Sequence, residues 1–173
     1  MRLFSFIAAS SNSGKTTLLE KVVVILKAKG LRVAVVKHTS LGFDLDKPAK
    51  DSWRFQQAGA DTVVLVGPGK MAIMKTVEHE PTQQELLQAI GDADIALCEG
   101  FKKNDMNMIE VFRYGASGER PLCMDGGSSF LALVSDRPFT VSIPCFDLND
   151  AHGVADFLLK KNSSCCVKKQ TKQ

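Results

Sequence analysis

The stretch that constrains this chain most is the segment Ser-Gly-Lys-Thr-Thr at residues 13–17, together with what stands on either side of it. Residues 3–9 are apolar nearly throughout, as in a strand that is covered on both faces. Residues 18–29 carry apolar side chains at helical spacing. A strand, a Gly-Lys-Thr loop and a helix in this order are the setting of a phosphate-binding P-loop. The order predicts an α/β fold in which the loop binds nucleotide phosphates.

The residue types of this loop suit phosphate. Backbone N–H groups of such a loop surround phosphate oxygens, and the N-terminus of the following helix adds positive potential. Lys15, as a catalytic residue, would reach the β- and γ-phosphates, and Thr16 would place its hydroxyl on Mg²⁺. The predicted phosphate-binding residues are Asn12, Ser13, Gly14, Lys15, Thr16 and Thr17.

One position departs from the usual loop, because Ala9 stands five residues before Gly14, where the consensus has Gly. Gly supplies backbone freedom that Ala lacks, so the loop geometry at residue 9 is open. The alternative interpretation of the segment is an ordinary strand-to-helix turn. The agreement of strand, loop and helix favours the phosphate site. It does not say which base is bound or whether hydrolysis matters.

A second buried strand is predicted over residues 31–36, and it ends at Lys37 and His38. The strand-helix-strand order implies a parallel sheet with a right-handed crossover. Ligands of open α/β sheets lie beyond the carboxyl ends of the strands, so both side chains are predicted to bind the nucleotide. The alternatives are a plain surface lysine for Lys37 and a loop histidine bonded to backbone for His38.

Three aspartates, Asp44, Asp46 and Asp51, follow in the next loop. Carboxylates near a phosphate site can hold Mg²⁺, directly or through water, or position an attacking water. We therefore predict Asp44 and Asp46 as metal ligands and Asp51 as a catalytic residue. Asp51 is also a plausible N-cap of a short helix over residues 52–58, which is the alternative for that residue.

The apolar run at residues 94–98 ends in Glu99 and Gly100. A buried strand that ends in an acidic residue is typical of a Walker B segment, whose carboxylate reaches Mg²⁺ or its water shell. Glu replaces the commoner Asp. We predict Glu99 as a metal ligand and catalytic residue, and Gly100 as part of the nucleotide site.

A strand over residues 130–134 leads to Asp136, whose carboxylate could accept two hydrogen bonds from a guanine base. The usual Asn-Lys-x-Asp guanine motif is absent, and a turn cap is the alternative. Further elements are predicted as strands over 61–66, 70–77, 109–113 and 140–146, a helix from a capping box at 82–85 to 90, and a helix over 151–160 capped by Asp147 or Asn149. Together they predict a P-loop NTPase-like three-layer sandwich, with a mostly parallel sheet and helices on both faces.

Length and composition fit one domain with a short tail. The chain has 173 residues, 45% of them hydrophobic, which is enough for a core of ordinary size. We expect residues 1–161 to form the nucleotide-binding domain and residues 162–173 to be a disordered basic tail. The net charge of +3 lies largely in that tail, and no aromatic-basic face accompanies it. No nucleic-acid partner is expected.

The five cysteines form no Cys-x-x-Cys pair, and their number is odd. No signal peptide or apolar run of membrane length is seen, so we expect a cytoplasmic protein with reduced thiols and no membrane contact. Cys98 and Cys145 lie in apolar runs and are expected to be small buried hydrophobic residues.

Taken together, six segments resemble the molybdopterin-guanine dinucleotide biosynthesis protein B (MobB) family. They are Ser13-Gly14-Lys15-Thr16-Thr17-Leu18-Leu19, Val36-Lys37-His38, Phe43-Asp44-Leu45-Asp46-Lys47-Pro48, Lys50-Asp51-Ser52-Trp53-Arg54, Ala58-Gly59-Ala60 and Glu99-Gly100-Phe101-Lys102. The resemblance runs from about residue 3 to 160. Besides Ala9, the chain departs from the family at Ala49, where Gly is usual, and at Phe55, where His is common.

The resemblance implies a homodimeric GTP-binding protein with weak GTPase activity and with GTP and Mg²⁺ as ligands. It implies an accessory role to the molybdopterin guanylyltransferase (MobA-like), the enzyme that couples GMP to molybdopterin. Three alternatives remain at this point: a metallochaperone-type GTPase for another metal centre, a P-loop small-molecule kinase, and an adaptor that binds GTP without useful hydrolysis. No arginine stands out in the sequence as one that would assist hydrolysis.

Overall fold

The computed structural model describes residues 1–40, 42–43, 46–101, 107–126 and 129–161. The chain divides into two compact units, one of residues 1–38 and 90–173 and the other of residues 39–89. The sheet unit is the first of these, and the hairpin unit is the second. The expectation of one domain over 1–161 stays a prediction, and the predicted tail at 162–173 lies outside the described residues.

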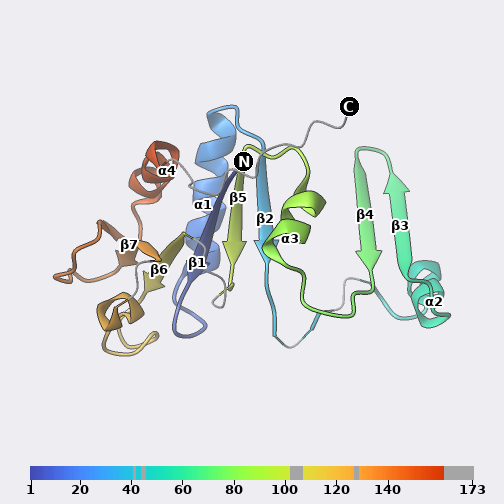
Figure 1. Ribbon diagram of the computed structural model, residues 1–173, viewed down its shortest axis with the longest axis horizontal. Coiled ribbons are helices and arrows are strands. Elements are labelled where there is room, and N and C mark those ends of the chain that lie inside the picture. Colours follow the sequence, from blue (N-terminus) through green and yellow to red (C-terminus); the bar gives the residue numbers. More distant parts are fainter. Residues whose placement is uncertain (41, 44–45, 102–106, 127–128, 162–173) are drawn as a thin grey trace. The chain divides into compact units, whose positions relative to one another are not determined.

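The sheet unit is built on six strands, and every neighbouring pair is parallel. The order across the sheet is β2-β5-β1-β6-β7-β8, so β1 lies inside the sheet between β5 and β6 (Figure 1). The elements of the unit are β1 (Arg2–Ile7), α1 (Lys15–Ala28), β2 (Val33–Lys37), β5 (Ile95–Glu99), β6 (Met108–Phe112), the 3₁₀ helix η1 (Leu122–Asp125), β7 (Phe130–Ser135), β8 (Cys145–Asp147) and α4 (Ala151–Lys160).

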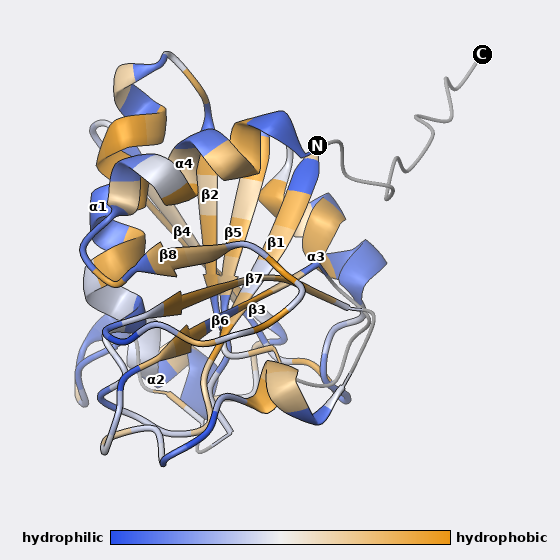
Figure 2. Ribbon diagram, turned by 90° about the vertical axis from the view of Figure 1, so that its left-hand side faces the viewer, coloured by the Kyte–Doolittle hydropathy of each residue, from blue (hydrophilic) through white to orange (hydrophobic). Residues whose placement is uncertain are grey.

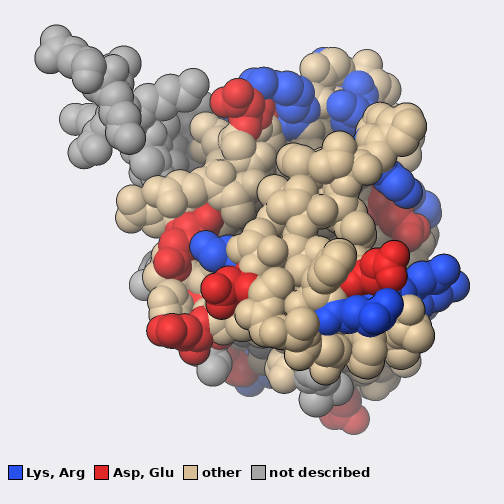
Figure 3. Space-filling model, turned by 90° about the vertical axis from the view of Figure 1, so that its right-hand side faces the viewer, with Lys and Arg blue, Asp and Glu red and all other residues tan. Residues whose placement is uncertain are grey.

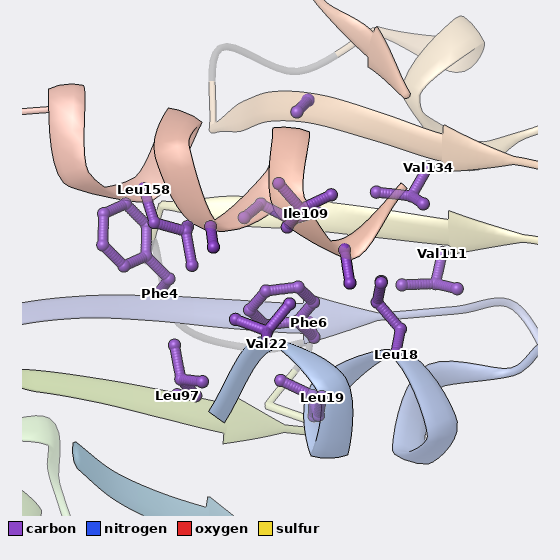
Figure 4. Packing of buried hydrophobic residues seen from close by; sticks show 14 of the residues in the cluster. Phe4, Phe6, Leu18, Leu19, Val22, Leu97, Ile109, Val111, Val134 and Leu158 are labelled. Carbon is purple, nitrogen blue, oxygen red and sulfur yellow. The ribbon is translucent and has the colours of Figure 1, made fainter. Parts of the chain in front are cut away.

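Alternate residues of the strands build the core of this unit. Phe4 and Phe6 of β1 point to the same side as Leu97 of β5 and Ile109 of β6, and all four are completely buried. The apolar faces of α1 and α4 close over them, as Figure 4 shows with Val22 and Leu158 between the strands and the helices. Figure 2 shows the same apolar colouring along β1 and β5. Parallel strands buried on both faces explain why their sequences are apolar almost throughout.

The other face of β6 carries a buried carboxylate. Glu110 is fully buried, and its two oxygens accept hydrogen bonds from the backbone N–H groups of Leu122 (2.7 Å) and Cys123 (2.8 Å) at the start of η1. Burial, with Glu110 beside it, raises the pKa of the Cys123 thiol to about 12. A buried carboxylate is tolerated because both of its oxygens are bonded. Glu110 therefore fastens the segment before β7 to the sheet.

The hairpin unit consists of α2 (Asp51–Gln57), the antiparallel pair β3 (Thr62–Gly67) and β4 (Lys70–Lys75), and most of α3 (Gln83–Ile90). The predicted capping box of α3 is confirmed. The Glu85 carboxylate accepts from the backbone N–H of Thr82 at 2.8 Å, and the N–H of Glu85 donates to Thr82 Oγ1 at 3.3 Å. The hydrogen bonds that the Glu85 carboxylate accepts from the backbone N–H and from the hydroxyl of Thr82 lower the pKa of Glu85.

Several sequence predictions are wrong in detail. The last strand is short, covering β8 alone instead of residues 140–146, because Pro144 has no N–H to donate to the sheet. The cap of α4 is Asp150, which accepts from the N–H of Gly153 at 2.8 Å. Asp51 is the first residue of α2 instead of its N-cap.

Cys98 is buried as predicted, and burial raises the pKa of its thiol to about 11, but Cys145 is exposed. Among the described residues, no helix combines the length and apolar character needed to cross a bilayer.

Candidate phosphate-binding site

The site lies at the carboxyl edge of the sheet unit, where β1, β5 and β2 end side by side. In the strand register, Glu99 of β5 stands next to Phe6 of β1 on one side and Lys37 of β2 on the other. The N–H of His38 donates to the carbonyl of Glu99 at 2.8 Å, so the strands stay together to their last residues. Parallel pairing thereby brings residues distant in sequence to the start of the loop that follows β1.

The loop after β1 has the backbone of an anion site. Asn12 and Gly14 adopt positive φ angles of 64° and 91°, which turn the chain sharply before α1 begins at Lys15. No side chain caps α1, and its first turn holds no acidic residue. The N-terminus of a 14-residue helix with neither feature keeps its positive potential for a ligand.

A hollow of about 500 Å³ opens at this loop. Its lining residues are Ser11, Asn12, Ser13, Gly14, Lys15, Thr16, Thr17, Lys37, Glu99 and Arg113. All six predicted phosphate-binding residues of the loop are among them, and so are the predicted Lys37 and Glu99. The hollow carries three cationic side chains and one carboxylate, a balance that suits a polyphosphate accompanied by a cation.

Lys15 is held over the loop. Its ammonium group donates to the hydroxyl of Ser13 at 3.2 Å and to the carbonyl of Ser10 at 3.3 Å. Ser13 itself is buried, so one end of this contact is fixed. The ammonium group is thus placed within the loop, where the phosphates of a nucleotide would be bound.

Thr16 and Glu99 form a pair at one end of the hollow. The Thr16 hydroxyl donates to Glu99 Oε1 at 2.9 Å. A hydroxyl and a carboxylate oxygen at hydrogen-bonding distance are the hard oxygen donors that Mg²⁺ takes from a protein, the rest of its shell being water and phosphate oxygen. The donor set therefore fits Mg²⁺. Within the described residues, no group of three His, Cys, Asp or Glu side chains could hold a metal by itself.

Ala9 is compatible with the loop. Among the described residues other than Gly, only Asn12 and Ala49 have positive φ, so the backbone at Ala9 stays in a region open to any residue. The departure from the consensus at this position does not spoil the loop. The departure at Ala49 strains the backbone more, since Ala49 has a φ of 70°, a conformation that favours the Gly usual in the family.

Gly100 and His38 shape the turn after β5. Gly100 has a φ of 96°, and a Cβ at this position would lie 3.1 Å from the carbonyl oxygen of His38. The ring of His38 packs against that of Phe101, with centroids 4.9 Å apart. The hydroxyl of Ser5 donates to the carbonyl of Phe101 at 2.9 Å and fixes it to β1. Neither His38 nor Gly100 lines the hollow, and both support the strand ends beside it.

Asp136 follows β7, at the same edge of the sheet but two strands from β1. Its Oδ1 accepts from the backbone N–H of Tyr114 at 2.9 Å, and it does not line the hollow. This contact corresponds to the turn-cap alternative, while its second oxygen makes no such bond to Tyr114. Reading of guanine by Asp136 stays a prediction.

The predicted acidic residues of the next loop are not among the described residues of the sheet unit. Asp44 lies outside the described residues. Asp46 and Asp51 belong to the hairpin unit, where Asp51 faces Arg54 at 3.7 Å on an exposed surface. Their roles toward metal or water stay predictions.

Besides Ser11, Arg113 is the residue lining the hollow that the sequence did not single out. It is the first residue after β6 and lines the hollow with Lys15 and Glu99. The one available signal was its place at the carboxyl end of a predicted strand, where ligands of α/β sheets bind.

The sheet and its helices define an α/β protein with a P-loop-like fold and a mostly parallel sheet, so the predicted fold class is confirmed. The family model described as molybdopterin guanine dinucleotide synthesis protein B (MobB) matches residues 4–136. The chain belongs to the MobB family, as its sequence resemblance indicated.

Two curated relatives carry the name molybdopterin-guanine dinucleotide biosynthesis adapter protein. The one from Escherichia coli (strain K12) is 37% identical over 157 residues, which cover 88% of this chain and 89% of the relative. The one from Haemophilus influenzae is 34% identical over 155 residues, covering 88% and 85%.

Solved structures agree. A crystal structure of molybdopterin-guanine biosynthesis protein B (mobB) superposes with a TM-score of 0.70 at 28% identity, covering 91% of this chain and 97% of that one. The crystal structure of Bacillus subtilis MobB gives a TM-score of 0.73 at 22% identity, covering 92% and 96%, and shows the shared fold.

Proposed function

We propose that this protein is a GTP-binding adapter in the biosynthesis of molybdopterin guanine dinucleotide, with weak GTPase activity. The observation that carries the proposal is the hollow at the loop after β1, where Lys15 lies beside the uncapped start of α1 and Thr16 pairs with Glu99. Membership of the MobB family, and relatives named as adapter proteins for this cofactor, give the site its context.

The residues of the hollow have separate tasks in this proposal. Backbone N–H groups of residues 12–17 surround the phosphates, and the Lys15 ammonium neutralises β- and γ-phosphate oxygens. Thr16 and Glu99 hold Mg²⁺, directly or through its water shell. When bound there, Mg²⁺ neutralises charge that develops on the phosphates. Lys37, at the end of β2, adds a second cation on the metal side of the hollow.

Within the described residues of the sheet unit, Glu99 is the one carboxylate that lines the hollow, so a residue that orients the attacking water would come from another part of the chain. Asp51 is proposed for that task, with Asp44 or Asp46 completing the metal shell. The choice of guanine is proposed to rest on Asp136.

The partners proposed are the molybdopterin guanylyltransferase, molybdopterin itself and a second copy of this chain. The exposed side chains of the hairpin support the proposal that a second copy of this chain is a partner. Val64 pairs with Ile73 and Val66 with Met71, so the four side chains share one face of the hairpin. They are between 49% and 79% exposed, and Figure 3 shows how broad an uncharged area one side of the molecule presents. Exposed apolar faces of this kind mark protein contacts.

A second copy fits this face because β3 and β4 are both edge strands of a two-stranded sheet. The same strands of a partner can pair with these edges about a two-fold axis, which satisfies their backbone groups. Packing of the two apolar faces against each other about such an axis would bury the four side chains. A two-stranded hairpin alone in water is only marginally stable, so the unit gains from such a contact.

The proposed function is tested in two steps. Calorimetric titration with non-hydrolysable GTP and ATP analogues in Mg²⁺ should give tighter binding of the GTP analogue. Addition of the protein to a guanylyltransferase, molybdopterin and GTP should then raise the yield of the guanine dinucleotide. Preference for the ATP analogue would point instead to a P-loop kinase, and an unchanged yield would contradict the adapter role.

A further inference from the structure

Arg113 has an unusual place beside the phosphate loop. A Cβ at Gly14 would lie 3.3 Å from the Nη2 atom of Arg113, so the guanidinium packs directly against the loop backbone. The side chain lines the same hollow as Lys15 and is otherwise exposed. Among the described residues, no Asp or Glu forms an ion pair with it. The positive charge therefore lies at the hollow without an ion pair to any carboxylate of the described residues.

The backbone that carries Arg113 is fastened on several sides. Its N–H donates to the hydroxyl of Ser117 at 3.2 Å, and the N–H of Ser117 donates to its carbonyl at 2.8 Å. The hydroxyl of Ser10, in the loop after β1, donates to the carbonyl of Ala116. These bonds tie the turn after β6 to the phosphate loop, so the backbone that carries the guanidinium is positioned before any ligand arrives.

The sheet order gives the hollow two distinct ends. β5, with Glu99, flanks β1 on one side, and β6, with Arg113, flanks it on the other. Leu148, which follows β8, also contacts the position of a Gly14 Cβ and so lies on the Arg113 side. Thr16 and Glu99 mark the end at which Mg²⁺ and the γ-phosphate would be held. The α-phosphate, and the nucleoside attached to it, would then lie toward the opposite end.

We infer that Arg113 binds the α-phosphate end of the nucleotide instead of assisting the transfer of the γ-phosphate. The inference rests on the proposed nucleotide function and assigns one further contact to it. A guanidinium donates two parallel N–H bonds to phosphate oxygens, which a lysine cannot do. Because every nucleotide of the series has an α-phosphate, the contact would contribute to GTP and GDP equally.

The test compares Arg113→Ala with the wild-type protein by titration with GDP and with a non-hydrolysable GTP analogue. Both affinities should fall by the same factor, about tenfold or more, as for the loss of a charge-assisted contact. In GTP hydrolysis, the loss should raise KM by a larger factor than it lowers kcat. Arg113→Lys should recover part of the affinity, because it restores the charge without the planar fork. Arg120→Ala, which removes an exposed arginine paired with Asp125, is the matched control and should bind as wild type.

The other outcomes overturn the inference in distinguishable ways. Unchanged GDP affinity with a lower kcat would place Arg113 at the γ-phosphate. Unchanged GDP and GTP binding in Arg113→Ala, with tight wild-type binding, would leave the proposed function standing and remove only Arg113 from the site. Wild-type protein that binds neither nucleotide would overturn both.

Discussion

The sheet unit and the hairpin unit place their apolar residues in opposite ways. In the sheet unit, Phe4, Phe6 and Leu97 are completely buried beneath two helices. In the hairpin unit, Val66 and Met71 are 79% and 63% exposed. The comparison teaches that the candidate phosphate site belongs to the unit with a fully buried hydrophobic core, and such a core can hold a loop in a fixed geometry. The hairpin presents an exposed apolar face among the described residues, as an assembly surface would.

The largest effect is expected for a core residue of the sheet unit. Phe6→Ala removes a fully buried ring from the cluster beneath α1 and should lower the free energy of unfolding by about 3–5 kcal/mol. In protein diluted until it is monomeric, Met71→Ala, on the exposed hairpin face, should change it by less than about 0.5 kcal/mol. Urea unfolding of both variants is the measurement. Equal losses would contradict the contrast between the units.

A charge on the hairpin face should break the dimer and spare the nucleotide site. Val66→Lys places an ammonium group in the proposed dimer contact, where it would be buried without a partner. The dissociation constant of the dimer should therefore rise at least tenfold. Light scattering after size-exclusion chromatography reports the mass. Val24→Lys, at an exposed position of α1, is the control and should leave the dimer intact. A wild-type monomer, or a Val66→Lys dimer of unchanged affinity, would remove the hairpin from assembly.

Glu110 tests how the sheet unit holds its own loop. Glu110→Gln leaves one oxygen for the two N–H groups of Leu122 and Cys123 and sets an amide N–H against the other. The unfolding free energy should fall by about 1–3 kcal/mol, the cost of an unsatisfied buried group. Chemical denaturation measures it, with the exposed Glu119→Gln as control. No difference between the two variants would refute the anchoring role.

A small increase in stability is expected from a substitution in the hairpin unit. Ala49 has a φ of 70°, which is strained for a residue with a Cβ. Ala49→Gly removes strain of about 1–2 kcal/mol and adds unfolded-state entropy that costs about 0.5–1 kcal/mol, so the net change should be a stabilisation of no more than about 1.5 kcal/mol. Thermal unfolding should show a slightly higher midpoint. A lower midpoint would mean that the local strain is absent.

The smallest expected effect is a pH dependence at the edge of the sheet unit. Hydrogen bonds from Arg32 lower the pKa of Asp94 from 3.8 to about 2. The depressed pKa stabilises the fold above pH 4, and this contribution is lost as the pH falls toward 2. The small stability difference between wild type and Asp94→Asn should therefore vanish over that window. Asp92→Asn, which changes a neighbouring carboxylate, should show less of this dependence.

Sequence alone located what local patterns determine. The strands β1, β5 and β7 were found because strands buried on both faces read as continuous apolar runs. The phosphate loop was found because its geometry needs particular residues at fixed spacing. Arg113 was not found, because its contact with Gly14 exists only when β6 lies next to β1. Contacts between these segments join residues that are far apart in the sequence, such as Ser10 and Ala116, whose positions differ by 106. The N-cap of α4 was misplaced because Asp147, Asn149 and Asp150 are equally suitable cap residues by type. The residue at which the helix begins decides between them, and this residue makes Asp150 the cap.

The most direct test of the central claim is calorimetric titration with a non-hydrolysable GTP analogue, with and without Mg²⁺, on wild type, Lys15→Ala and the control Lys21→Ala. Lys21 lies exposed on α1, outside the residues that line the hollow. We expect Mg²⁺-dependent binding to wild type and Lys21→Ala and no measurable binding to Lys15→Ala. Equal affinity of Lys15→Ala and wild type would contradict the assignment of the nucleotide site to the loop after β1.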